Sequence, residues 1–103
     1  MAKLKDIARV IRSKNAGALL LTLDIMFSDD ETYQHVLKAG VISPRTIAPF
    51  YGLTDNEVAI IPFEVARAIK ITIPRRVPSG SPGDMDVYGA QQHAPLLDIE
   101  VPD

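Results

Sequence analysis

Residues 12–27, with the sequence RSKNAGALLLTLDIMF, decide the fold around which the rest of the chain is built. The stretch opens with four polar residues, Arg12, Ser13, Lys14 and Asn15. A hinge at residues 16–17 separates them from the most apolar run of the chain, residues 18–27. That run is too short to cross a membrane and is typical of a strand buried on both faces. We therefore expect a polar loop at the end of a buried strand, a common place for a functional site.

Alternation along this strand predicts which side chains share a face. One face holds Leu19, Leu21, Leu23 and Ile25, and the other holds Leu20, Thr22 and Asp24. A carboxylate inside an apolar strand needs a partner or a place at the end of the sheet. For Asp24 we expect a structural ion pair with Lys14 or Arg67, and a catalytic acid is the alternative.

Length, net charge and cysteine count limit the class of protein. The chain has 103 residues, which predicts a single domain over residues 1–103. Its net charge is −2, so there is no basic excess of the kind that nucleic acid binding needs. There are no cysteines, and the first residues carry no apolar signal region. We expect a cytoplasmic protein that binds neither nucleic acid nor membranes.

The middle of the chain predicts helices followed by a hairpin. Residues 4–11 fit either a strand or a helix, and a strand is the preferred interpretation. Ser28 and Glu31 match a capping box for a helix over residues 29–39 that ends at Gly40. Ser43 and Pro44 predict a second helix start. The β-rich residues 58–63 and the alternating residues 68–73 predict a hairpin, with Pro62 at an edge or bulge.

The C-terminal part predicts a long ordered segment and a last strand. Residues 75–95 are rich in proline and glycine, and residues 96–101 alternate, with Leu97, Ile99 and Val101 on one face. The fold class is therefore α+β: an antiparallel sheet with helices on one face, resembling a ferredoxin-like sandwich. An extra N-terminal strand and a long ordered C-terminal loop complete it.

Two polar segments are the candidate site. The ligand-binding candidates are Arg12, Ser13, Lys14, Asn15, Tyr88, Gln91 and Gln92, and the catalytic candidates are His93, Asp84 and Asp86. Arg and Lys with amide donors suit a carboxylate or phosphate. His93 is suited to proton transfer near neutral pH, and we expect it within reach of Asn15. In the structural alternative, Asp84 is a turn residue and the glutamines tie the loop down.

Other chemistry has weaker support. The pair Asp84 and Asp86 with His93 could hold a divalent metal, but the spacing is generic and we expect neither a metal nor a cofactor. His35 lies among charged residues on the first helix, which favours a solvated face over catalysis. No phosphate-binding loop, dinucleotide fingerprint or zinc motif occurs.

Several segments resemble a small bacterial family of domains of unknown function. They are LKDIARVIRSKNAG, LLTLDIMF, AIKITIPR and SGSPGDMDVYGAQQHAPLLDIEVP, which cover nearly the whole chain. That family is similar, more distantly, to the ferredoxin-fold tail of AtuA-like proteins of acyclic terpene utilisation. The tail carries a polar turn of the R-S-G-D-K-G type, from which residues 12–17 depart in the order of acidic and basic residues.

The resemblance implies a companion protein. It indicates that the chain is the small subunit, or detached tail, of an AtuA-like enzyme acting on a small organic (di)carboxylic acid, with a hydratase or lyase type of reaction. In that hypothesis Arg12, Lys14 and Asn15 hold the carboxylate and His93 carries the proton. The alternative is a non-catalytic module that binds an anionic ligand or partner protein. We also expect a homo-oligomer when the companion is absent.

Overall fold

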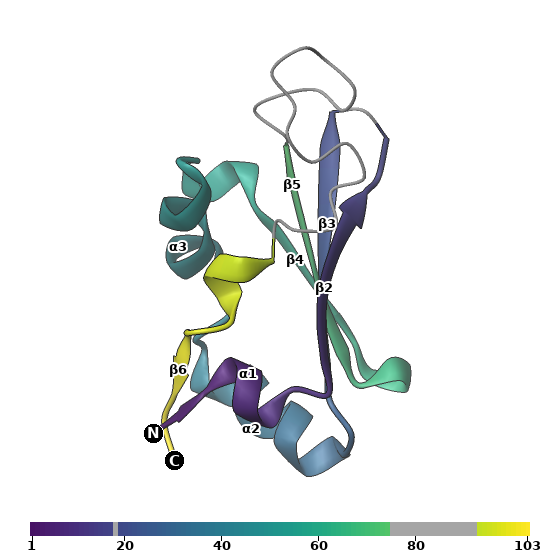
Figure 1. The fold of residues 1–103 in the computed structure, drawn as a ribbon, viewed down its shortest axis with the longest axis vertical. Helices are drawn as coiled ribbons and strands as arrows, with labels where there is room; N and C mark the ends of the chain where they lie inside the picture. The colour runs from purple at the N-terminus through teal and green to yellow at the C-terminus, as the bar shows by residue number, and fades with distance from the viewer. Residues whose placement is uncertain (18, 75–92) are drawn as a thin grey trace.

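The computed structural model describes residues 1–17, 19–74 and 93–103. The central element is an antiparallel sheet with the strand order β2-β3-β5-β4 (Figure 1). Its strands are β2 (Val10–Asn15), β3 (Leu20–Met26), β4 (Ala59–Phe63) and β5 (Ala68–Pro74). A separate pair is formed by β1 (Ala2–Lys3) and β6 (Glu100–Val101). The predicted α+β class with an antiparallel sheet is confirmed.

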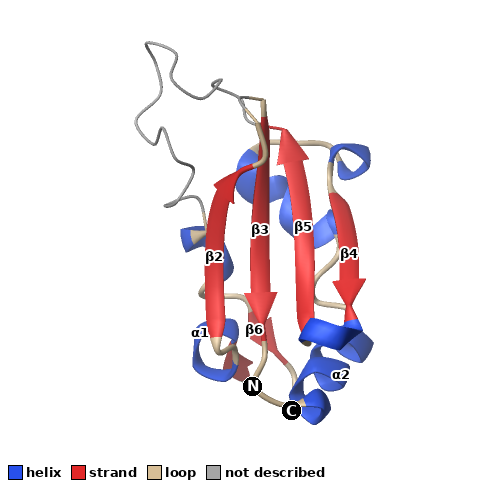
Figure 2. Ribbon diagram, turned by 90° about the vertical axis from the view of Figure 1, so that its right-hand side faces the viewer, coloured by secondary structure: helices blue, strands red, loops and turns tan. Residues whose placement is uncertain are grey.

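The helices α1, α2 and α3 lie on one face of this sheet (Figures 1 and 2). The helical segments are α1 (Leu4–Ile7), α2 (Asp30–Ala39), α3 (Pro44–Ile47), η1 (Ala48–Tyr51), η2 (Asp55–Glu57), η3 (Glu64–Ala66) and η4 (Ala94–Leu96). Strands β3 and β4 both pair antiparallel with β5, so they run in the same direction with β5 between them. Because α2 and α3 connect β3 to β4, these elements form a split β-α-β unit of the ferredoxin-like kind.

The core lies between the sheet and the helices. Its sheet side is made of Leu21, Leu23, Ile25, Ile69, Ile71 and Ile73. Tyr33 and Val36 of α2, Ile47 of α3 and Leu96 of η4 pack on the other side and are all fully buried. We call this the inner face of the sheet. No helix of the described residues is long and apolar enough to cross a membrane.

Several predicted helix ends are confirmed, and one is wrong. Ser43 caps α3 with Pro44 in the first turn, and Gly40 ends α2 in the left-handed conformation at φ 70°. The cap of α2 is Asp29 rather than Ser28, because the Asp29 carboxylate accepts a 2.7 Å hydrogen bond from the Thr32 N–H. The predicted hairpin is also confirmed, and Pro62 lies on the edge strand β4.

The strand predicted over residues 4–11 is wrong. A helix covers Leu4–Ile7, and strand β2 starts only at Val10. The N–H of Leu4 donates to the carbonyl of Ile99 at 2.7 Å. The N–H of Lys5 donates to the carbonyl of Leu97 at 3.1 Å. The C-terminal segment thereby satisfies first-turn donors that so short a helix otherwise leaves exposed.

The last strand is also shorter than predicted. Of residues 96–101, only Glu100–Val101 form a strand, and they pair with β1 instead of the main sheet. The preceding turn η4 buries Leu96 rather than Leu97. With α1, this segment covers part of the inner face, where a second long helix lies in a ferredoxin-like sandwich.

Candidate functional site

The predicted polar loop at Arg12–Asn15 is a strand. Residues Val10–Asn15 form β2 and pair in continuous register with β3. In a strand successive side chains point to opposite faces, and directly paired residues of an antiparallel sheet share a face. Ser13 and Asn15 pair with the core residues Leu23 and Leu21, so they lie on the inner face. The four polar residues therefore do not form one cluster.

Arg12 and Lys14 lie on the opposite face, which we call the outer face. Arg12 pairs with Asp24 of β3, and Asp24 in turn pairs with Lys70 of β5. Lys14 pairs with Thr22. Figure 2 shows this face toward the viewer, with helices visible behind the sheet. The register thus brings three cationic side chains from two strands around a single carboxylate.

Asp24 is the centre of this arrangement. The Arg12 Nε donates to Asp24 Oδ2 at 3.2 Å; the Asp24 side chain is 8% exposed and the Arg12 side chain 53%. Because no helix among the described residues covers Asp24 on the outer face, we infer that long side chains from neighbouring strands exclude water from it. The expected structural ion pair is confirmed, but the partner is Arg12 rather than Lys14 or Arg67.

A small groove adjoins this ion pair. It has a volume of about 150 Å³, and we call it the outer groove. Its lining residues are Arg12, Lys14, Asp24, Met26, Phe63, Ala66, Ala68 and Lys70. Three of these are cationic and one is acidic, whereas the whole chain carries a net charge of −2. Such a donor set suits a carboxylate, since Arg and Lys supply only hydrogen-bond donors.

Lys70 and Phe63 were missed by the sequence interpretation. The alternation of β5 places Lys70 outward, a signal the sequence contains. What the sequence does not contain is the register that sets Lys70 beside Asp24 and Phe63 beside Ala68. Cross-strand register depends on tertiary packing and on turn geometry.

The catalytic candidates are only partly described. Asp84, Asp86, Tyr88, Gln91 and Gln92, with the predicted order of residues 75–92, lie outside the described residues. His93 directly precedes η4, and its Nδ1 is buried with no hydrogen-bond partner in the described part of the chain. Its predicted proximity to Arg12–Asn15 stays a prediction.

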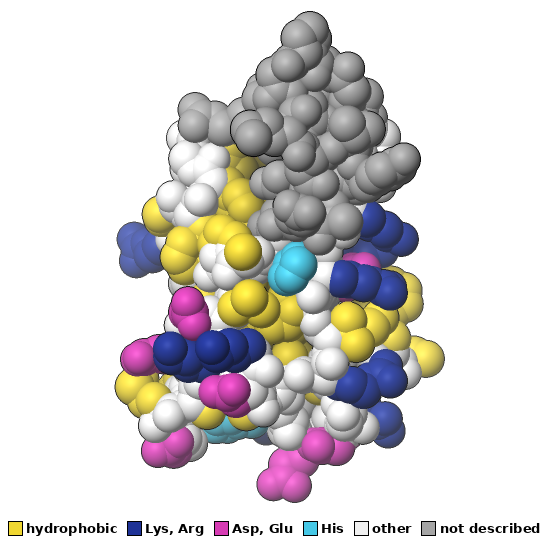
Figure 3. Space-filling model, in the orientation of Figure 1, with side chains coloured by type: hydrophobic (Ala, Val, Ile, Leu, Met, Phe, Trp, Pro, Cys, Tyr) yellow, Lys and Arg dark blue, Asp and Glu magenta, His cyan; other side chains and the backbone are white. Residues whose placement is uncertain are grey.

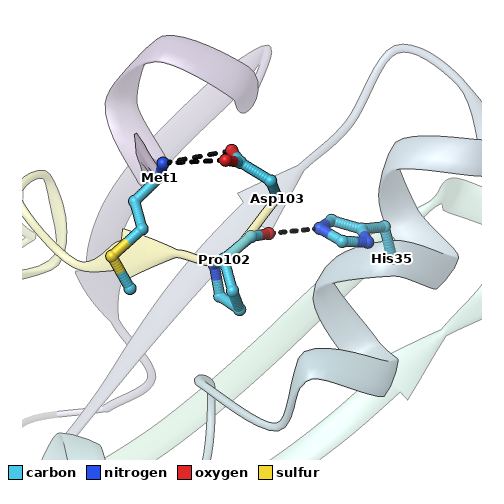
Figure 4. Close-up of polar contacts among 4 residues, drawn as sticks. All are labelled: Met1, His35, Pro102 and Asp103. Atoms are coloured by element: carbon cyan, nitrogen blue, oxygen red, sulfur yellow. Dashed lines mark hydrogen bonds and ion pairs between the residues drawn. The ribbon is translucent and has the colours of Figure 1, made fainter.

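A second depression lies where the chain ends meet α2 (Figure 4). The carbonyl of Pro102 accepts a 2.6 Å hydrogen bond from His35 Nε2, and the Met1 amine lies 3.1 Å from Asp103 Oδ1. Glu31 and Thr32 of α2 also line this 380 Å³ space. His35 is exposed, and its hydrogen bond to the Pro102 carbonyl connects the C-terminal segment to α2.

Three groups in the described part of the chain have shifted pKa values. One is Tyr51, because burial raises the pKa of its hydroxyl. Burial, with smaller contributions from Glu64 and Asp30, raises the pKa of the Tyr33 hydroxyl. The hydrogen bonds from Thr32 lower the pKa of the Asp29 carboxyl. None of these three groups lines the outer groove. Within residues 1–17, 19–74 and 93–103, no three His, Cys, Asp or Glu side chains gather in a metal-binding cluster.

Comparison with known protein families finds a match. The model of a family described as "Domain of unknown function (DUF4387)" matches residues 4–100. No curated protein and no solved structure matches the chain. The matched range contains every residue of the outer groove.

Proposed function

Because this chain belongs to the DUF4387 family of domains of unknown function, we propose a function from its outer groove: it is a binding module that recognises a carboxylate group. The observation that carries the proposal is the set Arg12, Lys14 and Lys70 around the outer groove. Arg12 is already paired with Asp24, so Lys14 and Lys70 supply the charge for an incoming anion. A groove of 150 Å³ is smaller than typical cofactor sites of about 300–1,000 Å³, which favours one small acidic group.

The resemblance to AtuA-like tails supplies the biological setting of this proposal. In it the chain is a cytoplasmic accessory subunit of an AtuA-like enzyme that acts on a small organic (di)carboxylic acid. Co-expression of the two proteins tests this setting, and the expected result is that the companion co-purifies with the tagged chain. Failure to co-purify, with both proteins soluble, would contradict the companion but not the groove.

The groove itself is tested by titrating the ¹⁵N-labelled full chain with succinate at constant ionic strength. We expect the chemical shifts of the backbone amides of Arg12, Lys14 and Lys70 to change and to saturate, with a Kd in the millimolar range. The double variant Lys14→Glu/Lys70→Glu should lose them, whereas Lys38→Glu on the exposed surface of α2 should keep them. Equal shifts in all three proteins, or none, would contradict carboxylate binding by the groove.

A second candidate function is catalytic, and it is favoured by the buried Nδ1 of His93, which has no hydrogen-bond partner among residues 1–17, 19–74 and 93–103. Such a nitrogen is available to accept or donate a proton, as an accessory subunit completing an active site requires. If His93 is a proton carrier, His93→Ala lowers the activity of the AtuA-like complex without weakening its assembly. If the chain only binds, His93→Ala leaves activity intact and Lys14→Glu/Lys70→Glu weakens assembly.

A further inference from the structure

Exposed apolar side chains border the outer groove. Ile61 and Phe63 of β4 and Val65 of η3 are 46%, 53% and 97% exposed. In the β4–β5 register, Ile61 pairs with Lys70 and Phe63 with Ala68, so both lie on the outer face. Phe63 also lines the groove itself, which joins the charged and apolar parts. We call these three residues the apolar ridge.

Val65 of the ridge lies in the turn between β4 and β5, and this turn contacts the β3–α2 connection through Arg67. Arg67 adopts the left-handed conformation at φ 49°, which costs a non-glycine residue free energy. Its carbonyl accepts a 2.9 Å hydrogen bond from the Phe27 N–H, and its guanidinium donates to the Ser28 carbonyl at 3.4 Å. These contacts fasten the turn to the β3–α2 connection. A turn anchored in this way loses less entropy when it binds another surface than a free loop does.

From these observations we propose that the outer face docks a second protein. The partner presents an Asp or Glu side chain that enters the outer groove between Lys14 and Lys70, and apolar residues beside it cover Ile61, Phe63 and Val65. This inference rests on the proposed carboxylate recognition and names the source of the carboxylate. A free small acid leaves the ridge in water, whereas a protein surface covers both parts.

The chemistry of the face favours such a partner over a second copy of this chain. Face-to-face pairing of two copies sets Arg12, Lys14 and Lys70 against the same cations, and juxtaposed like charges cost free energy. Figure 3 shows Lys and Arg side chains interspersed with apolar atoms along the right-hand side of the molecule, where the outer face lies, and most acidic atoms below and to the left. Arginine, methionine and aromatic residues, all present in the groove, are enriched at protein interfaces.

Zero-length carbodiimide cross-linking tests the contact directly, because it joins a lysine amine to a carboxylate only where the two touch. The tagged full chain is cross-linked in extract of cells that naturally contain it, and the joined peptides are sequenced. We expect an amide between Lys14 or Lys70 and an Asp or Glu of a different protein. That protein is then purified, and the Kd of its complex is measured with the unmodified chain and with each of three variants.

The expected loss of affinity is about tenfold or more for Lys14→Glu/Lys70→Glu and for Phe63→Ser, with no change for Lys38→Glu. Thermal unfolding of each variant shows whether it is folded. Amide formation at Lys14 and Lys70 no greater than at Lys38, or only with another copy of the chain, overturns the docking proposal. If succinate still shifts the groove amides in that case, carboxylate recognition stands and only the protein partner is wrong. If it does not, both proposals fail.

Discussion

At the scale of single residues, Asp24 is the central residue of the outer groove, which it lines and where it pairs with Arg12. Its side chain is 8% exposed although no helix in the described part of the chain covers it, and Arg12 supplies its ion pair. A carboxylate in such a position is costly without a partner, so Arg12 stabilises the strand as well as contributing charge to the groove. The binding experiments therefore substitute Lys14 and Lys70, because these substitutions leave the Arg12–Asp24 ion pair intact.

The first prediction concerns this ion pair. Arg12→Met leaves the Asp24 carboxylate without its partner, and we expect the free energy of unfolding to fall by about 1–2 kcal/mol, because Arg12 is half-exposed. The double variant Arg12→Met/Asp24→Leu should recover most of that loss, since no buried charge remains. Urea denaturation measures both values, with Lys14→Met as the control that changes by less than about 0.5 kcal/mol. An unfolding free energy unchanged in Arg12→Met would contradict the stabilising role of the pair.

Tyr33 gives the second prediction. Its side chain is fully buried, and its hydroxyl has no hydrogen-bond partner among the described residues. We expect Tyr33→Phe to leave stability unchanged or to raise it by up to about 1 kcal/mol, because an unsatisfied polar group is removed and the ring remains.

The same tyrosine predicts a pH dependence with a definite sign. Because the folded pKa of Tyr33 is raised, its contribution to stability is complete below the unfolded pKa of about 10 and is lost as pH rises above it. The stability advantage of Tyr33→Phe over the unmodified chain should therefore grow above pH 10. Chemical denaturation at pH 8 and at pH 10.5 measures this difference, and a constant difference would contradict the buried hydroxyl.

At the scale of elements, capping patterns and alternation predict this chain well, and residues whose structure depends on distant partners are predicted poorly. Local interactions between residues close in sequence determine the helix cap at Ser43, the helix end at Gly40 and the hairpin of residues 58–63 and 68–73. Helix α1 instead depends on carbonyls of Ile99 and Leu97, more than ninety positions away. The outer groove likewise depends on the register between β2, β3 and β5. The sequence therefore predicted only Arg12 and Lys14 of its cations as site residues.

The cap of α2 gives the third prediction. The folded pKa of Asp29 is lowered, so the stability it contributes is present above its unfolded pKa of about 3.8 and is lost as pH falls through the folded pKa. We expect Asp29→Asn, which still caps the helix, to unfold at a Tm that depends less on pH below 4 than that of the unmodified chain. Ser28→Ala is the control and should leave the acid dependence unchanged, because Ser28 is not the cap. An acid dependence altered equally by both variants would contradict the role of Asp29.

At the scale of the whole molecule, the two faces of one sheet differ in what packs against them. The inner face carries the core, to which α2, α3, α1 and η4 all contribute. The outer face keeps charged and apolar side chains in water with no described element over them. Apolar surface left open beside a fixed charge cluster is typical of an interaction surface, which supports a binding role for the domain.

The last prediction concerns self-association. In the absence of a companion we expect at least a dimer, because a domain of this size with exposed sheet edges gains buried surface by pairing. The outer face is unsuited to that pairing because its cations repel, and Pro62 removes a donor from the β4 edge. The dimer should therefore form through another surface, and Lys14→Glu/Lys70→Glu should have the same mass as the unmodified chain. Light scattering at micromolar concentration measures both masses. A clean monomer would contradict self-association, and a change of mass in the double variant would place the outer face in the dimer interface and contradict its assignment to a different protein.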